Sequence, residues 1–295
     1  MVDSFPGLSA ASVSSVYRPS TMTVLASGDY VAVADCLAPL SSLVTHQQDL
    51  TIAEALDLGL KFLGSHYRNE YYFKNTIISR IVFGRHRPTT SSALVELPTR
   101  QSIADVVVLN GTSTAYEIKT DLDSFGRLST QIESYESCFE HVNVVTSESR
   151  AARAVTLTPD YVGVLALRKN GALSVIRPSR DGLDRLRPDK MFEILRQEEA
   201  MDLLRRTSNF EIDVAPGHSW ARYKDKFLEL PRETAHVAFV DQLRRRGMRA
   251  SQLVCHGDFP DSLRALAFGS HLSRPRRRAL LKMLVTPINE FEAAA

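Results

Sequence analysis

The 295-residue sequence predicts an α/β protein in which helices flank a mixed sheet and a mainly helical C-terminal part follows. Three observations indicate this fold class. Two segments with apolar residues at three- and four-residue spacing precede a group of strand-like segments. An Asn-Gly pair separates two of these strand-like segments, as in a β-hairpin. A helical segment and an uninterrupted apolar segment come next, which is the order of a parallel crossover.

The first regular helices are predicted between residues 51 and 84. Residues 1–50 have few charges and no regular periodicity, although a short helix and a strand fit TVLASGDYVAVADCL. Helical spacing begins at Thr51. A second helix is expected from about Arg68 to Phe83, because apolar residues line one side of it, and Gly84 suits its C-cap.

The strand-like segments follow the loop RHRPTTSS, which is rich in Pro, Thr and Ser. Strands are predicted at 93–97, 102–110 and 114–119, with Asn110-Gly111 between the last two. A helix is expected from about Ser124 to His141, and a buried strand at 142–147. These elements give the order helix, three strands, helix, strand.

The later part of the chain changes character. A second hairpin is predicted around Asn170-Gly171, and MFEILRQEEAMDLLRR is the clearest amphipathic helix. We therefore divide the chain into an N-terminal extension at 1–50, an α/β core at 51–185 and a helical basic domain at 186–295. The sequence has no internal repeat and no Walker A motif.

The composition is that of an ordinary globular protein, with 44% hydrophobic and 24% charged residues. A net charge of +2 permits nucleic-acid binding without arguing for it. The three scattered cysteines, Cys36, Cys138 and Cys255, indicate reduced thiols and are too few for a four-cysteine zinc or iron–sulfur site. No apolar run approaches ~18 residues, so a cytoplasmic protein without a membrane partner is expected.

Asp105 is the first residue that requires a chemical explanation, because it lies within the apolar strand SIADVVVL. A bare carboxylate there is unfavourable unless it is paired or bound to a cation. A two-residue turn at Asn110-Gly111 would pair Asp105 with residue 116, and a longer loop or a bulge would bring it level with Glu117. Because strand side chains alternate, Glu117 and Lys119 share one face.

Two carboxylates that converge from adjacent strands form a hard oxygen site suited to Mg²⁺ or Mn²⁺. A lysine beside them can position an attacking water and stabilise charge on a phosphoryl group. The alternative for Glu117 and Lys119 is a structural salt bridge on a wet sheet face.

The motif resembles that of the PD-(D/E)XK nuclease superfamily. AD at 104–105 is followed, after eleven residues, by EIK at 117–119. The next helix carries QIESY, which is similar to the Q-x3-Y motif of RecB- and Cas4-type nucleases, and DLDSFGRLSTQ resembles an uncharacterised bacterial and phage group of the superfamily. The resemblance covers roughly residues 65–150. It implies a restriction-endonuclease-like core of α-β-β-β-α-β order, and Ala104 departs from the proline of the motif.

The resemblance also implies site roles. Asp105 and Glu117 would bind the metal and Lys119 would serve the nucleophilic water, while Gln131 and Tyr135 would contact substrate or brace the site. The superfamily often adds a carboxylate from the preceding helix, for which Glu70 is the first candidate and Glu96 the competing one. The alternative for Glu70 is a solvated helix face, and for Glu96 a surface carboxylate at the end of a strand. Gln131 and Tyr135 could be ordinary residues of an amphipathic helix.

Two aspartates before the predicted helix have a local explanation. Asp121 and Asp123 are expected to begin and N-cap the helix that carries Gln131. A role for Asp121 in the site is the less favoured alternative.

The C-terminal part carries a basic excess. Residues 241–285 hold ten Lys or Arg and three Asp or Glu, including the runs RRR at 244–246 and RPRRR at 274–278. Phosphate contacts are predicted for these arginines: Arg244, Arg245, Arg246, Arg276, Arg277 and Arg278. A turn at Gly247 would fit a helix-turn-helix, and a solvated basic face is the alternative.

These features predict a Mg²⁺- or Mn²⁺-dependent DNA nuclease in genome maintenance or defence. The alternative is a catalytically silent nuclease-like module that binds nucleic acid or an assembly partner, and RNA is a less favoured substrate. Since the chain has no nucleotide-binding loop, a helicase for processive degradation, or a defence-system component, would be a separate protein.

Overall fold

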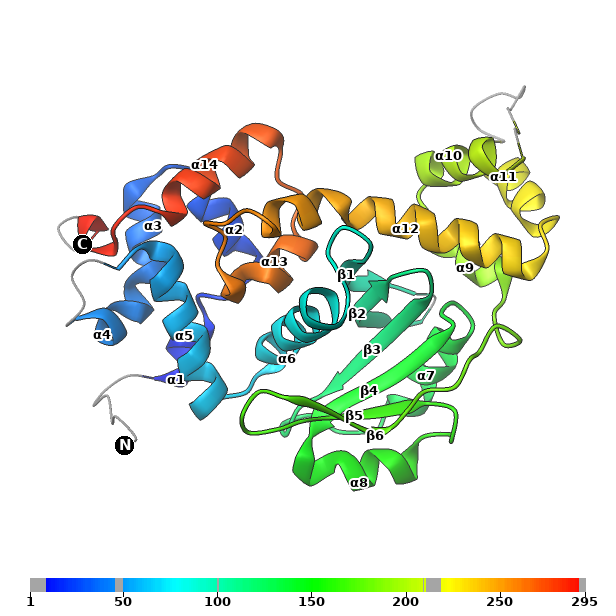
Figure 1. Ribbon diagram of the computed structural model, residues 1–295, viewed down its shortest axis with the longest axis horizontal. Coiled ribbons are helices and arrows are strands. Elements are labelled where there is room, and N and C mark those ends of the chain that lie inside the picture. Colours follow the sequence, from blue (N-terminus) through cyan, green and yellow to red (C-terminus); the bar gives the residue numbers. More distant parts are fainter. Residues whose placement is uncertain (1–8, 46–49, 100, 209, 211–218, 292–295) are drawn as a thin grey trace. The chain divides into compact units, whose positions relative to one another are not determined.

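The computed structural model describes residues 9–45, 50–99, 101–208, 210 and 219–291 (Figure 1). The chain forms two compact units. The first combines Met1–Ser79 with Arg249–Ala295, and the second is Arg80–Met248. The division of the sequence into segments 1–50, 51–185 and 186–295 stays a prediction.

A six-stranded mixed sheet forms the second unit, with strand order β1-β2-β3-β4-β5-β6. Strands β1 to β3 are antiparallel, β3, β4 and β5 are parallel, and β6 returns antiparallel. The predicted mixed α/β sheet is confirmed. The strands are β1 (Ser92–Pro98), β2 (Ile103–Leu109), β3 (Ser113–Lys119), β4 (His141–Ser147), β5 (Gly163–Leu167) and β6 (Leu173–Arg177).

The hairpin between β2 and β3 sets the register of the site. Leu109 pairs with Ser113, so the loop has three residues and the two-residue turn is wrong. Gly111 takes a φ of 101°, a left-handed conformation that glycine adopts without strain. The register continues to Val106 and Tyr116, so the longer-loop alternative holds and the next residues, Asp105 and Glu117, are level with each other.

Helices connect and cover the strands of this unit. α7 (Leu128–Glu136) joins β3 to β4, and α8 (Glu148–Leu157) joins β4 to β5. Both lie against the sheet (Figure 1). Side chains from the sheet and from α7 share one hydrophobic core with the later helices. Those helices are α9 (Pro188–Ile194), α10 (Gln197–Ser208), α11 (Ser219–Leu228) and α12 (Arg232–Val254), which continues into the first unit.

Three helix predictions for this unit need correction. The helix expected at 124–141 is limited to α7. The amphipathic segment MFEILRQEEAMDLLRR divides into α9 and α10, because Leu195 has an extended backbone with ψ 145°. The turn expected at Gly247 is absent, since α12 runs through it. A Cβ on Gly247 would meet Ser92 Oγ at 2.1 Å and Ala93 O at 2.8 Å, so glycine is required for close approach of α12 to β1.

The first unit is helical and joins both ends of the chain. Ile52 N donates to Thr286 O at 3.0 Å, and Thr51 forms the predicted helix start as a capping box with Glu54. The strand suggested before residue 50 is absent, since two helices occupy that segment. The main helices are α1 (Ala10–Ser14), α2 (Pro19–Leu25), α3 (Tyr30–Leu37), α4 (Ser41–Val44), α5 (Ile52–His66), α6 (Glu70–Ile77), α13 (Arg264–Gly269) and α14 (Arg274–Leu284).

The helix expected to end at Gly84 instead changes type. α6 ends at Ile77 and the chain continues as a π-helix from Ile78 to Arg85. π-Helical turns are uncommon and often occur near functional sites. None of the described helices combines the length and the apolar character needed to cross a membrane.

Candidate active site

Asp105 lies where main-chain pairing between β2 and β3 ends. Asp105 directly precedes Val106, whose pair with Tyr116 is the last of the ladder, and its Oδ2 accepts a hydrogen bond from Ile118 N at 2.7 Å. The carboxylate is half-buried. This contact fixes Asp105 against β3 and places a negative charge beside the strand that carries Glu117.

Glu117 and Lys119 form a buried ion pair on β3. Lys119 Nζ lies 2.7 Å from Glu117 Oε1, and the two side chains are 7% and 3% exposed. Their shared face follows from strand alternation, as predicted. The structure brings this pair together in the interior, so the sheet face that carries it is not wet. Whether the salt bridge is only structural stays open.

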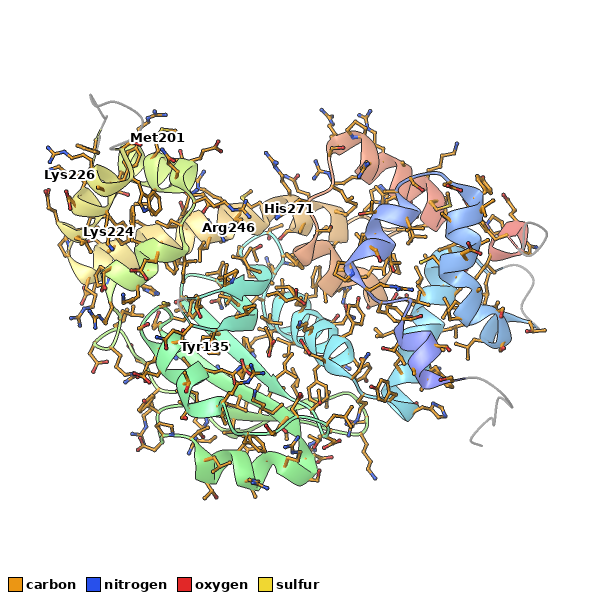
Figure 2. All side chains as sticks on the ribbon, turned by 180° about the vertical axis from the view of Figure 1, so that it is seen from behind. Tyr135, Met201, Lys224, Lys226, Arg246 and His271 are labelled. Atoms are coloured by element: carbon orange, nitrogen blue, oxygen red, sulfur yellow. The ribbon has the colours of Figure 1, made fainter. Side chains whose placement is uncertain are left out.

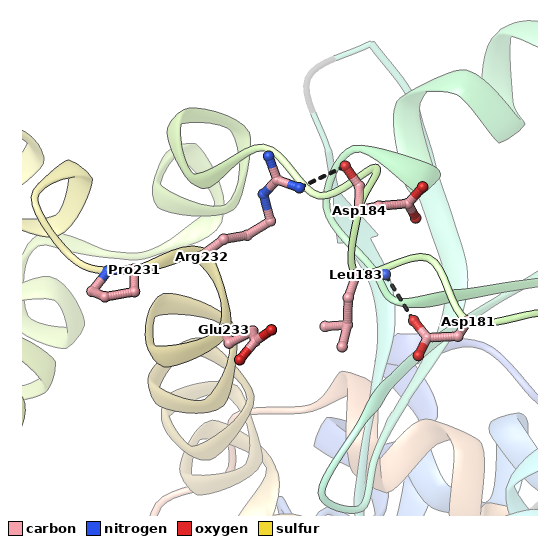
Figure 3. Close-up of a pocket in the computed structure, with 6 residues that line it drawn as sticks. All are labelled: Asp181, Leu183, Asp184, Pro231, Arg232 and Glu233. Carbon is pink, nitrogen blue, oxygen red and sulfur yellow. Dashed lines mark hydrogen bonds between the residues drawn. The ribbon is translucent and has the colours of Figure 1, made fainter.

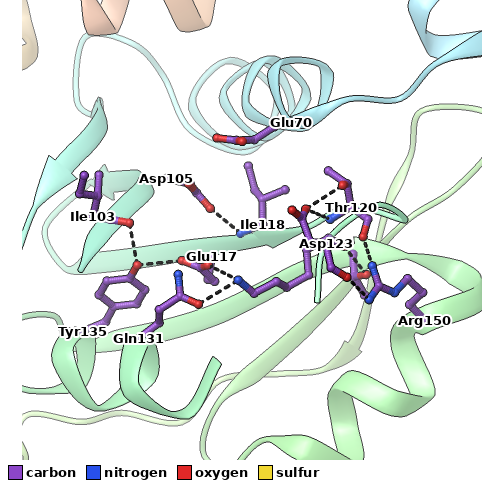
Figure 4. Close-up of polar contacts among 12 residues, drawn as sticks. Glu70, Ile103, Asp105, Glu117, Ile118, Thr120, Asp123, Gln131, Tyr135 and Arg150 are labelled. Carbon is purple, nitrogen blue, oxygen red and sulfur yellow. Dashed lines mark hydrogen bonds and ion pairs between the residues drawn. The ribbon is translucent and has the colours of Figure 1, made fainter. Parts of the chain in front are cut away.

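α7 supplies two further partners from one helical turn. Gln131 Oε1 accepts from Lys119 Nζ at 2.8 Å, and the Tyr135 hydroxyl donates to Glu117 Oε2 at 2.8 Å (Figure 4). The same hydroxyl lies 2.7 Å from Ile103 O. The side chains of β3 and α7 thus form one hydrogen-bonded network. In it Gln131 is half-buried, and the other three side chains are buried.

The electrostatics of this network act on Tyr135. Burial, and then the negative charge of Glu117, raise the pKa of its hydroxyl above the ordinary value, and Asp105 adds to the shift. A hydrogen bond from Gln131 acts in the opposite direction. Tyr135 therefore stays protonated and serves as a hydrogen-bond donor to the Glu117 carboxylate.

The loop after Lys119 is held by contacts that the sequence did not reveal. Asp123 Oδ2 accepts from Thr120 N at 2.8 Å and from Thr120 Oγ1 at 2.7 Å. Arg150, from α8, donates to the main-chain carbonyls of Thr120 and Asp123 (Figure 4). The Thr120-x-x-Asp123 spacing was the available local signal, whereas no local pattern indicates Arg150.

These contacts correct the predicted N-cap. α7 begins at Leu128, and its N-cap is Arg127 without a side-chain cap bond. Asp123 closes the preceding loop instead, and Asp121 accepts from the Ser147 hydroxyl at the end of β4. Asp121 and Asp123 therefore shape the loop that leaves β3.

Glu96 has an unusual backbone conformation and lies opposite Asp105 in the sheet. The pairs Val95–Val106 and Leu97–Ala104 place it opposite Asp105 in the register of β1 and β2. Its φ is 53°, and it is the one non-glycine residue in the described chain with a positive φ. A left-handed conformation is costly for such a residue, and residues with strained backbones are enriched at functional sites.

Glu70 is on α6, in the first unit. Its carboxylate is exposed and pairs with Lys74 at 2.6 Å, one turn along the same helix. Asn69 caps this helix by accepting from Tyr72 N. The metal-site role of Glu70 stays a prediction from the resemblance.

The carboxylates of the site suit a divalent cation of the Mg²⁺ type. In the part of the chain that the structure describes, no three His, Cys, Asp or Glu side chains form a ready metal site. Mg²⁺, however, is usually held by one or two carboxylates and keeps waters or phosphate oxygens elsewhere. Asp105 and Glu117 fit that pattern, because each oxygen of Glu117 holds one hydrogen bond and has a second lone pair.

The arginines of the run 244–246 have intramolecular partners. Arg244 and Arg245 pair with Asp241 at 3.2 and 2.9 Å. Arg246, labelled in Figure 2, is 9% exposed. Its ion pair with Glu199 at 2.5 Å joins α12 to α10. The phosphate contacts of these arginines stay a prediction, and for Arg246 they would require breaking a half-buried ion pair.

Three further predicted phosphate-binding residues lie at the start of α14. Arg276 and Arg278 are exposed, and Arg277 is half-buried with Nη1 donating to Arg249 O at 3.2 Å.

A separate cavity of about 660 Å³ lies beside the start of α12 (Figure 3). Asp181, Asp184 and Glu233 contribute three carboxylates to its lining, and Arg232 donates to Asp184 O at 2.7 Å. None of the candidate site residues lines it. Its acidic lining does not suit a phosphate polymer.

Known proteins resemble parts of this chain. The family profile described as bacteriophage P4 protein cII matches residues 64–255, which is more than half of the chain. Protein cII of Enterobacteria phage P4 is 33% identical over 69 residues, 23% of this chain and 26% of that protein, so the match spans about a quarter of that relative. A solved protein of unknown function from Silicibacter pomeroyi, SPO1766, matches with a TM-score of 0.29 and 16% identity, over 43% of this chain and 87% of that one.

Proposed function

The chain belongs to the bacteriophage P4 protein cII family, and we propose that it is a metal-dependent nuclease that hydrolyses phosphodiester bonds in DNA. One observation carries this proposal. Asp105 is level with Glu117 across β2 and β3, and Glu117 is paired in the interior with Lys119. Two carboxylates and an ammonium group in this arrangement suit phosphoryl chemistry better than a structural role.

A purely structural explanation of the pair is weak on energetic grounds. Removing two charges from water costs several kcal/mol per ion, by order of magnitude about as much as their attraction returns. Apolar side chains of similar volume would stabilise such a core position as well or better. A functional requirement explains why the charged residues Glu117 and Lys119 occupy this part of the core.

The residues would divide the work as follows. Asp105 and Glu117 would hold Mg²⁺ or Mn²⁺, which supplies charge stabilisation and an activated water. Lys119 has three ammonium hydrogens, and Glu117 and Gln131 accept two of them. Among the described residues the third has no acceptor, and it would orient a water or a phosphoryl oxygen. Gln131 and Tyr135 orient Lys119 and Glu117 from α7 and thereby keep the pair in one geometry.

The fold supports the same proposal. The order α6, β1, β2, β3, α7, β4 is the α-β-β-β-α-β order that the resemblance implies. A restriction-endonuclease-like core of the RecB- and Cas4-type subgroup is therefore part of the proposal. Glu96, opposite Asp105 in register, is a candidate for an additional carboxylate. Genome maintenance and anti-phage defence in the cytoplasm are the settings that this activity would serve.

The second candidate is a catalytically silent module that binds nucleic acid or an assembly partner. It is favoured by the burial of Glu117 and Lys119, because a closed pair restricts access of a polymer. The two candidates differ in metal uptake, which the silent module does not need.

The test is a digest of linear, circular and single-stranded DNA, with an RNA of the same sequence in parallel. The purified chain is incubated with Mn²⁺ or Mg²⁺, with and without EDTA. We expect DNA cleavage that EDTA abolishes and Asp105→Ala prevents. Cleavage that survives both EDTA and Asp105→Ala would show that another site or a contaminant is responsible. Cleavage of RNA alone would change the substrate class.

A further inference from the structure

The outward face of α14 carries a line of cations. Arg274, Arg278 and Lys282 follow one another at four-residue spacing, so their side chains lie on one side of the helix. All three are exposed. Residues 270–286 contain five Lys or Arg and no Asp or Glu. We refer to Arg274, Arg278 and Lys282 as the basic stripe.

The other side of α14 is used for folding. Leu280 and Leu284 are fully buried, and Met283 is nearly so. α14 contacts α2 and α5 within the first unit. The basic stripe is therefore on the solvent side of a helix whose apolar side is already covered.

Two further exposed cations lie on or near α14, outside the basic stripe. Arg276 is exposed in the first turns of α14. The hydrogen bond from Arg277 to the carbonyl of Arg249 brings the end of α12 beside α14, where the Arg249 side chain is also exposed. Among the described residues, the ion pairs of this unit involve other side chains.

Helix stability does not explain the placement. Most of the basic residues of α14 lie in its N-terminal half, and its first turn has no acidic residue. The positive end of the helix dipole disfavours cations there. Of the two arginine runs in the C-terminal part, the one at 244–246 is engaged by Asp241 and Glu199, whereas Arg274, Arg276 and Arg278 of the one on α14 are exposed.

We propose that the basic stripe binds the phosphate backbone of duplex DNA, as a surface additional to the candidate active site. The identity of the polyanion rests on the proposed function. The stripe extends over about 12 Å of helix, by the rise of 1.5 Å per residue. Duplex DNA carries one charge per about 1.7 Å of axis, so the stripe meets several phosphates. Arginine forks suit phosphate oxygens.

An anionic membrane is a poorer match to the same charges. A helix that binds in a membrane interface inserts its apolar face among the lipids. In α14 that face is occupied by the core of the first unit, through Leu280 and Leu284. The available side offers charge alone, which is what a linear polyanion in water requires.

The experiment measures binding of the full chain to a fluorescent 30-base-pair duplex in EDTA, so that no hydrolysis takes place. Fluorescence anisotropy is followed as salt is raised. The variant Arg274→Ala/Arg278→Ala/Lys282→Ala should bind more weakly. It should also lower the slope of log affinity against log salt by about 2 to 3, since each phosphate contact contributes roughly 0.9. Arg274→Lys/Arg278→Lys keeps the charges and should keep the wild-type slope.

The matched control removes the same net charge elsewhere. Lys169, Arg196 and Arg222 are exposed cations of the second unit, and their triple alanine variant should retain the wild-type slope. An equal fall in both triple variants, or no fall in the stripe variant, would overturn the inference. So would tighter wild-type binding to duplex RNA, or a stripe-dependent affinity confined to phosphatidylserine vesicles.

The test of the basic stripe and the test of the proposed function can fail separately. If the wild-type chain cleaves DNA with Mn²⁺ and the stripe variant binds as the wild type does, the inference about α14 fails and the proposed function stands. If stripe-dependent binding is found without any metal-dependent cleavage, the proposed function fails and the binding surface stands. Circular dichroism of each variant checks that the chain is folded.

Discussion

The ammonium nitrogen of Lys119 lies 2.7 Å from Glu117 Oε1, and both side chains are buried between β3 and α7. Each of the two residues also has a hydrogen-bond partner on α7, since Gln131 accepts from Lys119 and Tyr135 donates to Glu117. A buried pair with this many fixed partners has one geometry. A fixed geometry of this kind is what the proposed reaction at phosphorus would need.

Asp105→Asn tests the proposed metal site without disturbing the fold. An asparagine carbonyl can still accept from Ile118 N, so the strand contact is retained. The lost negative charge should weaken Mn²⁺ binding by at least about tenfold, which is about 1.4 kcal/mol. Isothermal titration calorimetry measures the affinity and thermal unfolding measures the fold. Unchanged Mn²⁺ affinity would remove Asp105 from the metal site.

Tyr135→Phe tests the brace from α7. The substitution removes the donor to the buried Glu117 carboxylate and should lower the free energy of unfolding by about 1–3 kcal/mol. Urea denaturation gives this value. Tyr161→Phe is the matched control, because Tyr161 donates to Glu136 at a half-buried position where water can replace it. An equal loss in the two variants would contradict a special role of the buried network.

His236 predicts a pH dependence of stability. It is buried, its Nε2 lies 2.8 Å from Ser113 Oγ, and Glu140, Asp181 and His141 are its charged or titratable neighbours. Burial lowers the pKa of His236 to about 4 from an ordinary 6.5, because the charged form is disfavoured. Between these values the unfolded chain binds the proton and the folded chain does not. Stability should therefore fall as pH drops from about 6.5 to about 4.

His236→Gln removes this titration. The difference in unfolding free energy between wild type and variant should change steadily over that pH range and be flat above pH 7. The neighbouring Glu140, whose pKa burial raises, acts in the opposite sense and is present in both proteins. A difference that is constant from pH 4 to pH 7 would show that His236 has an ordinary pKa in the folded chain.

Gly247→Ala distinguishes close packing from a turn. In an open helix interior, alanine would stabilise by about 1 kcal/mol over glycine. Here the added Cβ meets a backbone carbonyl, Ala93 O, at 2.8 Å, so we expect a net loss of about 1–3 kcal/mol. Gly257→Ala is the control, because no atom lies within 4 Å of its Cβ position. A stabilised Gly247→Ala protein would contradict the packing of α12 on β1.

Local patterns were sufficient for much of the fold. The strands and both Asn-Gly hairpins followed from alternation and turn residues. The spacing of Gln131 and Tyr135 placed both on the side of α7 that meets Lys119 and Glu117. The exact hairpin loop length was not encoded locally, because two- and three-residue loops both suit Asn110-Gly111. The register, and with it the alignment of Asp105 with Glu117, is fixed by pairing along the whole of β2 and β3.

Other features depend on residues far apart in the sequence. Gly247 was expected in a turn, but the contact that explains it comes from Ser92 on β1. Arg246 was grouped with phosphate-binding arginines, although Glu199 pairs with it in the fold. Likewise, Arg150 on α8 donates to the main-chain carbonyl of Asp123 in the loop after β3. Such partners are set by tertiary packing, which composition and periodicity do not contain.

The rate of plasmid cleavage with Mn²⁺, compared between the wild-type chain and Lys119→Ala, tests the central proposal most directly. Both proteins are first shown to be folded by circular dichroism and thermal unfolding, because the substitution leaves Glu117 without its cation. We predict cleavage by the wild type and a rate lower by at least ~100-fold in the variant. A folded Lys119→Ala protein that cleaves at the wild-type rate, or a wild-type chain that cleaves no form of DNA, would contradict it.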